Sequence, residues 1–539
     1  MTLKTHLKNI SIRQQKNIWT ASLVLSFSFA ISAALGLIRE RVIYPRFLSC
    51  CPQELDVYKA AFKLPDMVFK LLVTGALSAS FMPVFLSYSH KDKKHAHLLA
   101  STVINVLCVT LFISLLLIYL FAWPLSRLLA PGFNQPQLLL MVRLTRILLV
   151  AQIFFLISNF FTSIIQANQI FLVPSLSPIL YNLSIIFATL FLSPKWGISG
   201  VCLGAVFGAF LHFLIQVPLI FRLGFKYSFS FNTKIEGFRK IVRLMIPRSI
   251  STGLGEIESF FSLRWASLLP AGSFALYSLA LQLVFLPSRI FSTTISQASL
   301  PALSKRLAQN QMAKFKSLVV KILFQALFLS MPVAVIFLIY RLPIIRLVFG
   351  SKNFPWSATK KLAQTIIFLS PSIVLQSIIQ VLNRAFYAAQ NTKTPLNISL
   401  KSLGVGLAIA YILVKFTSLE IFGLAIGITV SNFIQAADLI TSFSSKINHL
   451  NYKKLFIRFT KILIPSVLMA LVAWASIRLS DQTIFDTTRT LNLLLLTATT
   501  SILSLAVYLF VAYLFKVKEI KDILKLLKKR SKLFDLSKS

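Results

Sequence analysis

The chain has 539 residues, of which 56% are hydrophobic and 13% are charged, and its mean hydropathy is +0.77. Soluble proteins carry charges on about a quarter of their residues, so this composition excludes an ordinary soluble protein and predicts a membrane protein. Lys and Arg number 56 against 15 Asp and Glu, but they lie in short loops and in the last segment, so we expect no basic soluble domain and no nucleic-acid partner.

Apolar runs long enough to cross a bilayer recur along the whole chain. The first is too long for the apolar part of a signal peptide, and we expect it to be a retained helix. About fourteen spans are predicted, and an even number places both termini on the same side of the membrane. The predicted spans cover residues 19–38, 58–88, 98–122, 142–167, 174–193, 197–221, 241–268, 272–300, 317–342, 362–388, 396–416, 419–444, 456–479 and 489–515.

The loop lysines and arginines predict the orientation, because cytoplasmic loops are enriched in them. With a cytoplasmic N-terminus, the cytoplasmic side collects more than twice as many of them as the opposite side. Both termini are therefore predicted to be cytoplasmic. The basic tail, 516–539, is expected to lie on anionic membrane lipid as an amphipathic helix.

Four features recur at an offset near 220 residues, which indicates an internal repeat. Pro65 in the second span corresponds to Pro287 in the eighth, 222 residues later, and Pro83 corresponds to Pro301 after 218. A glutamine before a proline and a stripe of small residues recur at 221 and 223. Each copy contains six spans, an even number, so both copies are expected to have the same orientation.

The repeat predicts an all-α polytopic membrane protein of two six-helix lobes and two additional helices. Stripes of small residues usually let helices pack closely rather than form sites, and the prolines serve either gating or the shape of the bundle. The expected domains are the N-lobe at 1–235, the C-lobe at 236–450, helices 13 and 14 at 451–515 and the basic tail at 516–539.

The acidic residues form no pattern typical of an enzyme or a metal site. The sequence contains no Asp-x-Asp and no His-x-x-Glu arrangement. Glu256 and Glu258 are close in sequence, but residues two apart point to different sides of a helix. The four cysteines show neither a disulfide framework nor a metal-binding spacing. We therefore expect no enzymatic activity, no metal and no cofactor.

Charged residues inside apolar spans are candidates for a functional site, because each is costly in hydrocarbon. Lys59, Lys63, Asp66 and Lys70 are spaced to line one face of the second span. Snorkelling at a helix end is the alternative, which we favour for Lys59 and Arg143. A cavity lined by Lys and Arg predicts an anionic substrate, and a phosphate or diphosphate fits it best. Other charged residues in or beside spans are Arg39, Glu40, Asp56, Glu256, Glu258, Arg264 and Arg289.

The most specific motifs lie in the first two spans. The first ends with SAALGLIRE at 32–40, and the second contains Asp56, AFKLP at 61–65 and GALSASFMP at 75–83. Together with the segment 166–182, these motifs resemble the LGxxRD end of the first helix and the proline-containing second helix of the MurJ (MviN) lipid II flippases. The resemblance extends over nearly the whole chain.

This resemblance implies the fold of the multidrug/oligosaccharidyl-lipid/polysaccharide exporter superfamily, with two lobes around a cavity and two extra helices forming a groove for a polyprenyl tail. It also implies that the chain moves lipid II, the undecaprenyl-diphosphate-linked peptidoglycan precursor, from the cytoplasmic to the periplasmic leaflet by alternating access. The expected location is the bacterial inner membrane, and the expected role is in peptidoglycan and cell-wall biogenesis and cell shape.

The resemblance also implies site residues. Arg39, Asp56 and Lys70 match substrate-binding positions of the family, and Lys63 lies on the same basic face. Counting back from Pro287 places the family's eighth-helix arginine on a glutamine in this chain. That glutamine is Gln282, and we expect Arg264 or Arg289 to compensate for the missing arginine.

Some family members couple transport to sodium through an acid on helix seven and an Asn-x-x-x-Asp motif on helix eleven. Glu256 matches the first position, but the second motif reads Asn397-x-x-x-Lys401. An ammonium group in place of a carboxylate argues against a sodium site. We expect Glu256 and Lys401 to form an ion pair that replaces the cation.

Several alternatives remain open. A related exporter of drugs or of another lipid-linked oligosaccharide is the nearest. A membrane glycosyltransferase would need loop carboxylates that the acid pattern does not offer, and an ion channel would normally be a smaller oligomer with a pore loop. A secondary role as a scaffold for cell-wall or division machinery is also open.

Overall fold

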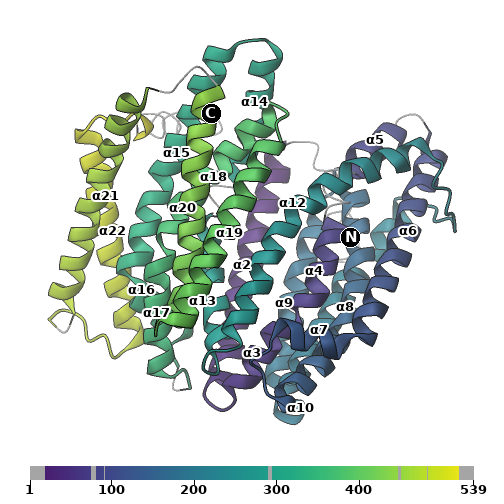
Figure 1. The fold of residues 1–539 in the computed structure, drawn as a ribbon, viewed down its shortest axis with the longest axis horizontal. Coiled ribbons are helices and arrows are strands. Elements are labelled where there is room, and N and C mark those ends of the chain that lie inside the picture. Colours follow the sequence, from purple (N-terminus) through teal and green to yellow (C-terminus); the bar gives the residue numbers. More distant parts are fainter. Residues whose placement is uncertain are drawn as a thin grey trace, which may run out of the picture. The chain divides into compact units, whose positions relative to one another are not determined.

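The computed structural model describes residues 18–74, 81–89, 92–288, 294–351, 353–446, 451–481 and 483–520. Within these ranges every regular element is a helix, and the β-bridge between Asp481 and Phe485 is isolated (Figure 1). The all-α class predicted from the sequence is confirmed.

The helices form two compact units, and the first contains the described residues up to Ala275 together with Ser351–Pro355. Within it, α10 packs on α8 and α9, α2 packs on α9, and α3 packs on α8. Its helices are α2 (Ile18–Leu48), α3 (Pro52–Ala61), α4 (Lys63–Phe69), the π-helix η1 (Lys70–Thr74), α5 (Met82–Ser89), α6 (Lys93–Leu120), α7 (Ala122–Leu129), α8 (Gln135–Ala167), α9 (Leu172–Phe191), α10 (Ser193–Leu214), α11 (Val217–Arg222), α12 (Glu236–Ala266) and the first turn of α13 (Ser273–Ser288).

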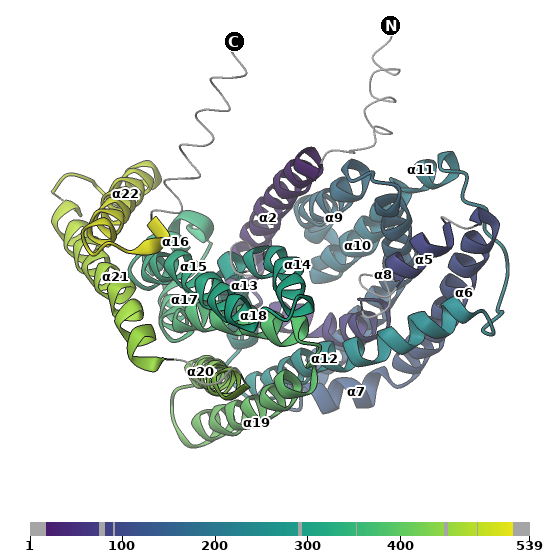
Figure 2. The same cartoon turned by 90° about the horizontal axis from the view of Figure 1, so that it is seen from above.

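The second unit contains the described residues from Leu276 to Gly350 and from Trp356 onward. Within it, α18 packs on α15 and α20, α19 packs on α20, and α21 packs on α15 and α22 (Figure 2). After the rest of α13, its helices are α14 (Thr294–Ala308), α15 (Met312–Ile339), α16 (Arg341–Phe349), α17 (Trp356–Leu369), α18 (Pro371–Ala388), α19 (Lys393–Phe416), α20 (Ile421–Lys446), α21 (Tyr452–Ser480) and α22 (Thr490–Leu514).

Ten of the described helical segments are long and apolar enough to cross a membrane. The other four predicted spans fall on α2, on the run from α3 to α5, on α12, and on α13 with α14. These are the spans in which the sequence places most of its charged residues. The ten segments are Lys93–Leu120, Gln135–Ala167, Leu172–Phe191, Ser193–Arg222, Met312–Ile339, Trp356–Ala388, Lys393–Phe416, Ile421–Ser445, Lys453–Ser480 and Thr490–Leu514.

The compact units divide the chain forty residues later than the predicted end of the N-lobe at 235. The reason is the packing of α12, which contacts α4, η1, α5, α6 and α7 of the first unit. The predicted domain limits describe the sequence repeat rather than this packing, and they stay a prediction.

Corresponding turns in the two copies have the same backbone conformation. Gln169 after α8 and Gln390 after α18 both have positive φ, 60° and 55°, at an offset of 221 residues. The next residue closes the turn in each copy, with the Ile170 N–H donating to the Ile165 carbonyl and the Asn391 N–H to the Phe386 carbonyl. Non-glycine residues rarely adopt this conformation, so its recurrence supports the internal repeat.

The stripes of small residues serve helix packing, as the sequence favoured. A side chain at Gly204 would collide with Ala188 on α9. In the second copy, a side chain at Gly427 would collide with Ala410 on α19, and one at Gly406 with Ser431 on α20. The α9–α10 and α19–α20 pairs are therefore held close because these positions lack side chains.

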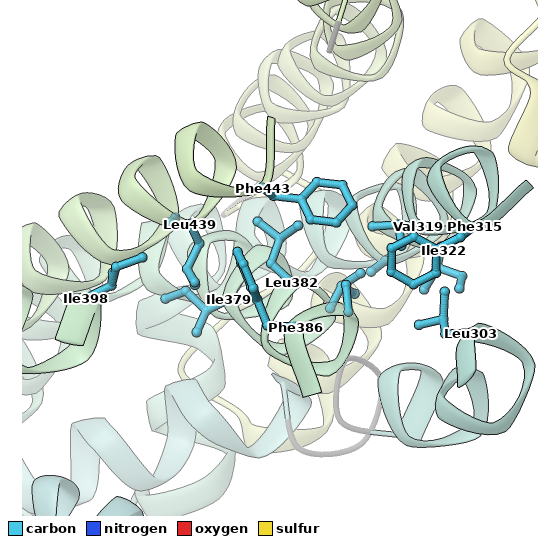
Figure 3. Close-up of a cluster of buried hydrophobic side chains, with 14 residues drawn as sticks. Leu303, Phe315, Val319, Ile322, Ile379, Leu382, Phe386, Ile398, Leu439 and Phe443 are labelled. Atoms are coloured by element: carbon cyan, nitrogen blue, oxygen red, sulfur yellow. The ribbon is translucent and has the colours of Figure 1, made fainter. Parts of the chain in front are cut away.

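The second unit has two clusters of buried apolar side chains. The first joins α14, α15, α18, α19 and α20 (Figure 3). The second joins α15, α21 and α22 and includes Val517 and Ile520 from the segment after α22. This cluster fixes the last two helices to α15, and Tyr508 strengthens it by donating a hydrogen bond to the Phe328 carbonyl at 2.8 Å.

Candidate functional site

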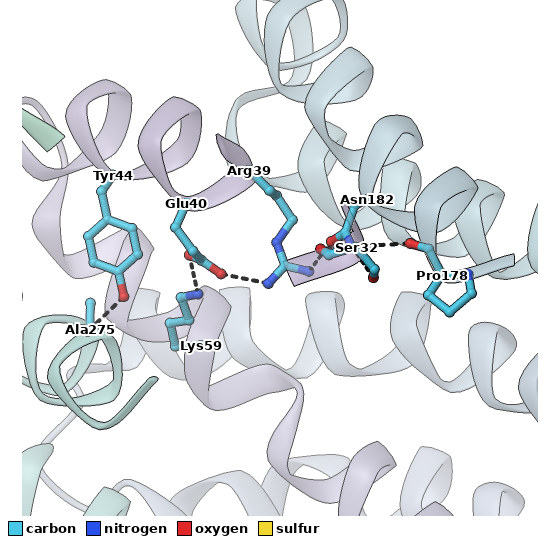
Figure 4. Close-up of polar contacts among 8 residues, drawn as sticks. All are labelled: Ser32, Arg39, Glu40, Tyr44, Lys59, Pro178, Asn182 and Ala275. Atoms are coloured by element: carbon cyan, nitrogen blue, oxygen red, sulfur yellow. Dashed lines mark hydrogen bonds and ion pairs between the residues drawn. The ribbon is translucent and has the colours of Figure 1, made fainter. Parts of the chain in front are cut away.

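The buried carboxylate of Glu40 lies between two cations (Figure 4). Helix α2 continues to Leu48, beyond the predicted end at 38, so Arg39 and Glu40 lie inside a helix. Arg39 Nη2 donates to Glu40 Oε1 at 2.6 Å, and Lys59 Nζ from α3 donates to Glu40 Oε2 at 2.7 Å. Glu40 is fully buried, and the group of three keeps one net positive charge.

Arg39 also contacts α9. Its Nη1 donates to Asn182 Oδ1 at 3.1 Å, and the Asn182 amide donates to the carbonyls of Pro178 and Ser32 (Figure 4). Pro178 has no N–H and lies inside α9, where a proline leaves a backbone carbonyl without its usual helical donor. Among the described residues the buried Nε of Arg39 has no hydrogen-bond partner. Arg39 is therefore held in position with one donor still available to an anion.

The expectation that Lys59 snorkels to the membrane surface is wrong. Its side chain is only 16% exposed, and the Nζ atom lies over the rings of Tyr44 and Tyr58, 5.2 and 5.6 Å from their centroids. The physical reason is the Glu40 carboxylate, which compensates a buried ammonium that would otherwise have to reach water.

Asp56 binds backbone rather than a charged partner among the contacts that the structure defines. Its Oδ2 accepts from the Gly272 N–H at 2.6 Å, and its Oδ1 accepts from the Ala275 N–H at 2.7 Å. These N–H groups belong to the start of α13, where a helix leaves donors unsatisfied. Tyr44 donates to the Ala275 carbonyl at 2.7 Å. Asp56 therefore fixes the first turn of α13.

The basic stripe of the second span divides among three helices. Lys63 donates to Ser259 Oγ at 2.5 Å and Lys70 to Glu256 Oε1 at 2.8 Å, so both side chains face α12. Lys59 turns to α2, and Asp66 accepts from Gln152 of α8 at 3.3 Å. The break at Phe62 and the π-helix after it separate the stripe into short segments. The shared face is thus observed for Lys63 and Lys70.

The expected ion pair between Glu256 and Lys401 is replaced by two others. Glu256 binds Lys70 in the first unit, and Lys401 binds Asp438 at 2.9 Å in the second. Helix packing brings α12 against η1, and α19 against α20, which supplies each charge with a nearer partner. Asn397 lies exposed on α19, one turn before Lys401.

The residues expected to replace the missing arginine are not brought together. Arg264 donates through Nη1 to the Leu128 carbonyl at the end of α7. Gln282 is half-buried on α13, in the part of that helix that belongs to the second unit. Arg289 lies outside the residues that the structure describes. Compensation by Arg264 or Arg289 therefore stays a prediction.

Asn182 and Ser259 were not predicted from the sequence. Asn182 is an amide in the middle of the apolar span 174–193 and is buried. A buried amide in hydrocarbon needs partners, and this criterion alone would have identified it. Ser259 offered no such signal, because a serine can bond its own helix backbone.

The arrangement is suited to binding an anion. Arg39, Lys63 and Lys70 are cations fixed by neighbouring side chains, and Arg39 retains a free donor. Within the described part of the chain, no group of three or more His, Cys, Asp or Glu side chains is placed to hold a metal ion.

Comparison with known proteins identifies the family. The family described as "Lipid II flippase MurJ" matches residues 53–509. A probable lipid II flippase MurJ of Bdellovibrio bacteriovorus is 28% identical over 434 residues, covering 79% of this chain and 82% of that protein. One from Rickettsia prowazekii is 25% identical over 506 residues, covering 93% and 98%.

Solved structures support the fold. A lipid II flippase MurJ in an inward closed conformation has a TM-score of 0.75 and 23% identity, covering 93% of this chain and all of that one. An inward-facing MATE multidrug transporter of the MOP superfamily has a TM-score of 0.65 and 16% identity, covering 79% and 98%. Since the family match spans most of a multi-pass membrane chain, this protein belongs to the lipid II flippase MurJ family.

Proposed function

We propose that this chain moves lipid II from the cytoplasmic to the periplasmic leaflet of the bacterial inner membrane by alternating access. The observation that carries the proposal is the family match over residues 53–509. The helical architecture and the cations of the first unit are compatible with it. The protein acts as a transporter in peptidoglycan biosynthesis rather than as an enzyme.

Arg39, Lys63 and Lys70 are proposed to bind the diphosphate of the substrate. Each ends in N–H groups that pair well with phosphate oxygens, and Lys70 is 46% exposed beside Glu256. Asp56 acts indirectly in this proposal, because both of its carboxylate oxygens bind the start of α13. Lys70 exchanges Glu256 for a phosphate when the substrate binds.

The arrangement in the membrane is also proposed. Both termini lie in the cytoplasm, as the loop charges favour. Helices α21 and α22 expose many large apolar side chains, Leu471, Trp474, Leu494 and Ile502 among them, and they offer a surface to the polyprenyl tail. The basic tail from Lys516 onward contacts anionic lipid, and the cell-wall machinery is a partner to be tested.

Complementation of a flippase-deficient bacterium tests the function. We expect the native chain to restore growth, and Arg39→Ala to fail although the protein reaches the membrane. Arg41→Ala is the matched control, because Arg41 is an exposed arginine two residues away. Lack of growth with the native chain at normal membrane levels would contradict the proposal.

Export of another lipid-linked oligosaccharide or of drugs is the second candidate, favoured by the similarity to a MATE transporter. Thermal stability of the purified protein distinguishes the two. Lipid II should raise Tm at concentrations at which drugs and undecaprenyl-phosphate-linked sugars without a diphosphate do not.

A further inference from the structure

A basic pocket lies in the second unit, where three long helices end. Its volume is about 590 Å³, and it is lined by the first turns of α15 and α21 and by the segment after α22. Pockets of this size hold small ligands or headgroups. All three helices are long and apolar enough to cross a membrane, so the pocket opens at the level where spans reach the membrane surface.

The charges of this pocket, which we call the α15–α21 pocket, are strongly unbalanced. Like charges so close together repel one another, and a bound anion relieves that repulsion. Six lining side chains are basic and one is acidic: Lys316, Lys454, Arg458, Lys461, Lys516, Lys518 and Glu519.

Arg458 is the anchored member of the pocket. It forms an ion pair with the buried Glu519, and its guanidinium lies over the Phe324 ring, 4.3 Å from the centroid. The Arg458 Nε is buried and has no hydrogen-bond partner among the described residues. A buried donor without an acceptor is unfavourable, and an acceptor oxygen inside the pocket would satisfy it.

The segment after α22 is fixed against the pocket rather than trailing from the helix. Lys516 has a φ of 52°, and the Val517 N–H donates to the Ala512 carbonyl at 3.0 Å, which is a helix-ending turn. Val517 and Ile520 are buried in the cluster of α15, α21 and α22. Lys516 and Lys518 are therefore held at the rim.

We propose that the α15–α21 pocket binds the phosphate of an anionic phospholipid, from the cytoplasmic leaflet if the proposed orientation holds. An apolar surface continues from the pocket along α21, and it suits an acyl chain. Ile457 lines the pocket and is 48% exposed, and Ile464, Leu468 and Leu471 follow on the same helical face with exposed side chains. Inorganic phosphate would leave this surface unused.

A pair of matched double variants tests the proposal in the full-length purified protein. Lys316→Gln with Lys454→Gln removes two pocket cations. Lys314→Gln with Lys453→Gln removes two exposed lysines from the same first turns of α15 and α21 that do not line the pocket. Native mass spectrometry and Tm in detergent are measured with phosphatidylglycerol, with phosphatidylcholine and with inorganic phosphate.

We expect phosphatidylglycerol to bind and to raise Tm, and phosphatidylcholine and inorganic phosphate to do neither. The pocket variant should bind phosphatidylglycerol about thirtyfold more weakly, since two cations near the headgroup are lost, while the control variant binds like the native chain. If the pocket variant fails to fold, Lys461→Gln with Lys518→Gln replaces it.

Three results would overturn the proposal. The first is equal weakening in the pocket and control variants, which would mean attraction by net charge alone. The second is equal binding of phosphatidylcholine. The third is a full Tm shift with inorganic phosphate, which would assign the pocket to a free anion. None of these measurements uses lipid II, so their outcome is independent of the proposed transport function.

Discussion

Glu40 is fully buried and binds two cations from different helices. Burying a charge is unfavourable unless partners compensate it, and removing one member of such a group leaves the others uncompensated. The two cations differ in what they can do next, since Lys59 is enclosed by Glu40 and two tyrosine rings, whereas Arg39 has an unused Nε. At the scale of the residue, Glu40 is the centre that positions Arg39.

Glu40→Gln should therefore destabilise the protein by about 3 to 5 kcal/mol, because it leaves two buried cations without a carboxylate. The measurement is Tm of the purified protein in detergent. Glu236→Gln is the control, because Glu236 is exposed at the start of α12 and a surface substitution changes little. An unchanged Tm for Glu40→Gln would show that the group contributes nothing to stability.

Substitutions of Asp56 should follow the number of acceptors that remain. Asp56→Ala removes both acceptors of the Gly272 and Ala275 N–H groups and should cost about 1 to 2 kcal/mol, as a lost helix cap does. Asp56→Asn keeps one acceptor and should lie between Ala and the native chain in Tm. If both variants melt like the native protein but do not transport, Asp56 acts on the substrate directly.

Sequence patterns located the charged residues of the site but not their partners. Arg39, Lys63 and Lys70 are identifiable because a charge in an apolar span is conspicuous. Arg39 and Asn182 are 143 residues apart, and Lys70 and Glu256 are 186 apart. No spacing rule connects such positions, since their contact depends on how α2 packs on α9 and η1 on α12.

At the scale of the element, apolar runs predicted the long helices because hydrocarbon requires about twenty apolar residues per span. The same signal could not reveal the short helices α7 and α16, which follow α6 and α15 in the two copies. It also could not reveal the π-helix at Lys70, because a wider helical turn depends on packing and not on hydrophobicity.

Two glycines of α19 give a test of helix packing. A side chain at Gly406 would collide with Ser431 and the Gly427 carbonyl on α20, whereas Gly404 has open space around it. Gly406→Leu should destabilise the protein by about 1 to 3 kcal/mol through overpacking, and Gly404→Leu should leave Tm nearly unchanged. Equal effects of the two substitutions, measured by thermal melting in detergent, would contradict close packing of α19 on α20.

At the scale of the whole molecule, the charges proposed to replace a coupling cation predict transport without sodium. Glu256 binds Lys70, and Lys401 binds Asp438, so each acid already has a fixed cation. The rate of lipid II transport in vesicles should be equal in sodium and potassium buffers of the same ionic strength. A rate that rises severalfold in sodium alone would contradict this prediction.

Transport of lipid II by the purified chain in lipid vesicles is the most direct test of the central claim. The measurement follows fluorescent lipid II placed in one leaflet and its appearance in the other. We expect vesicles with the native chain to exchange it faster than empty vesicles, and Arg39→Ala to slow exchange roughly tenfold to a hundredfold, as the loss of a charged hydrogen bond to phosphate would. Equal exchange in empty and protein-containing vesicles, with the protein folded, would contradict the claim.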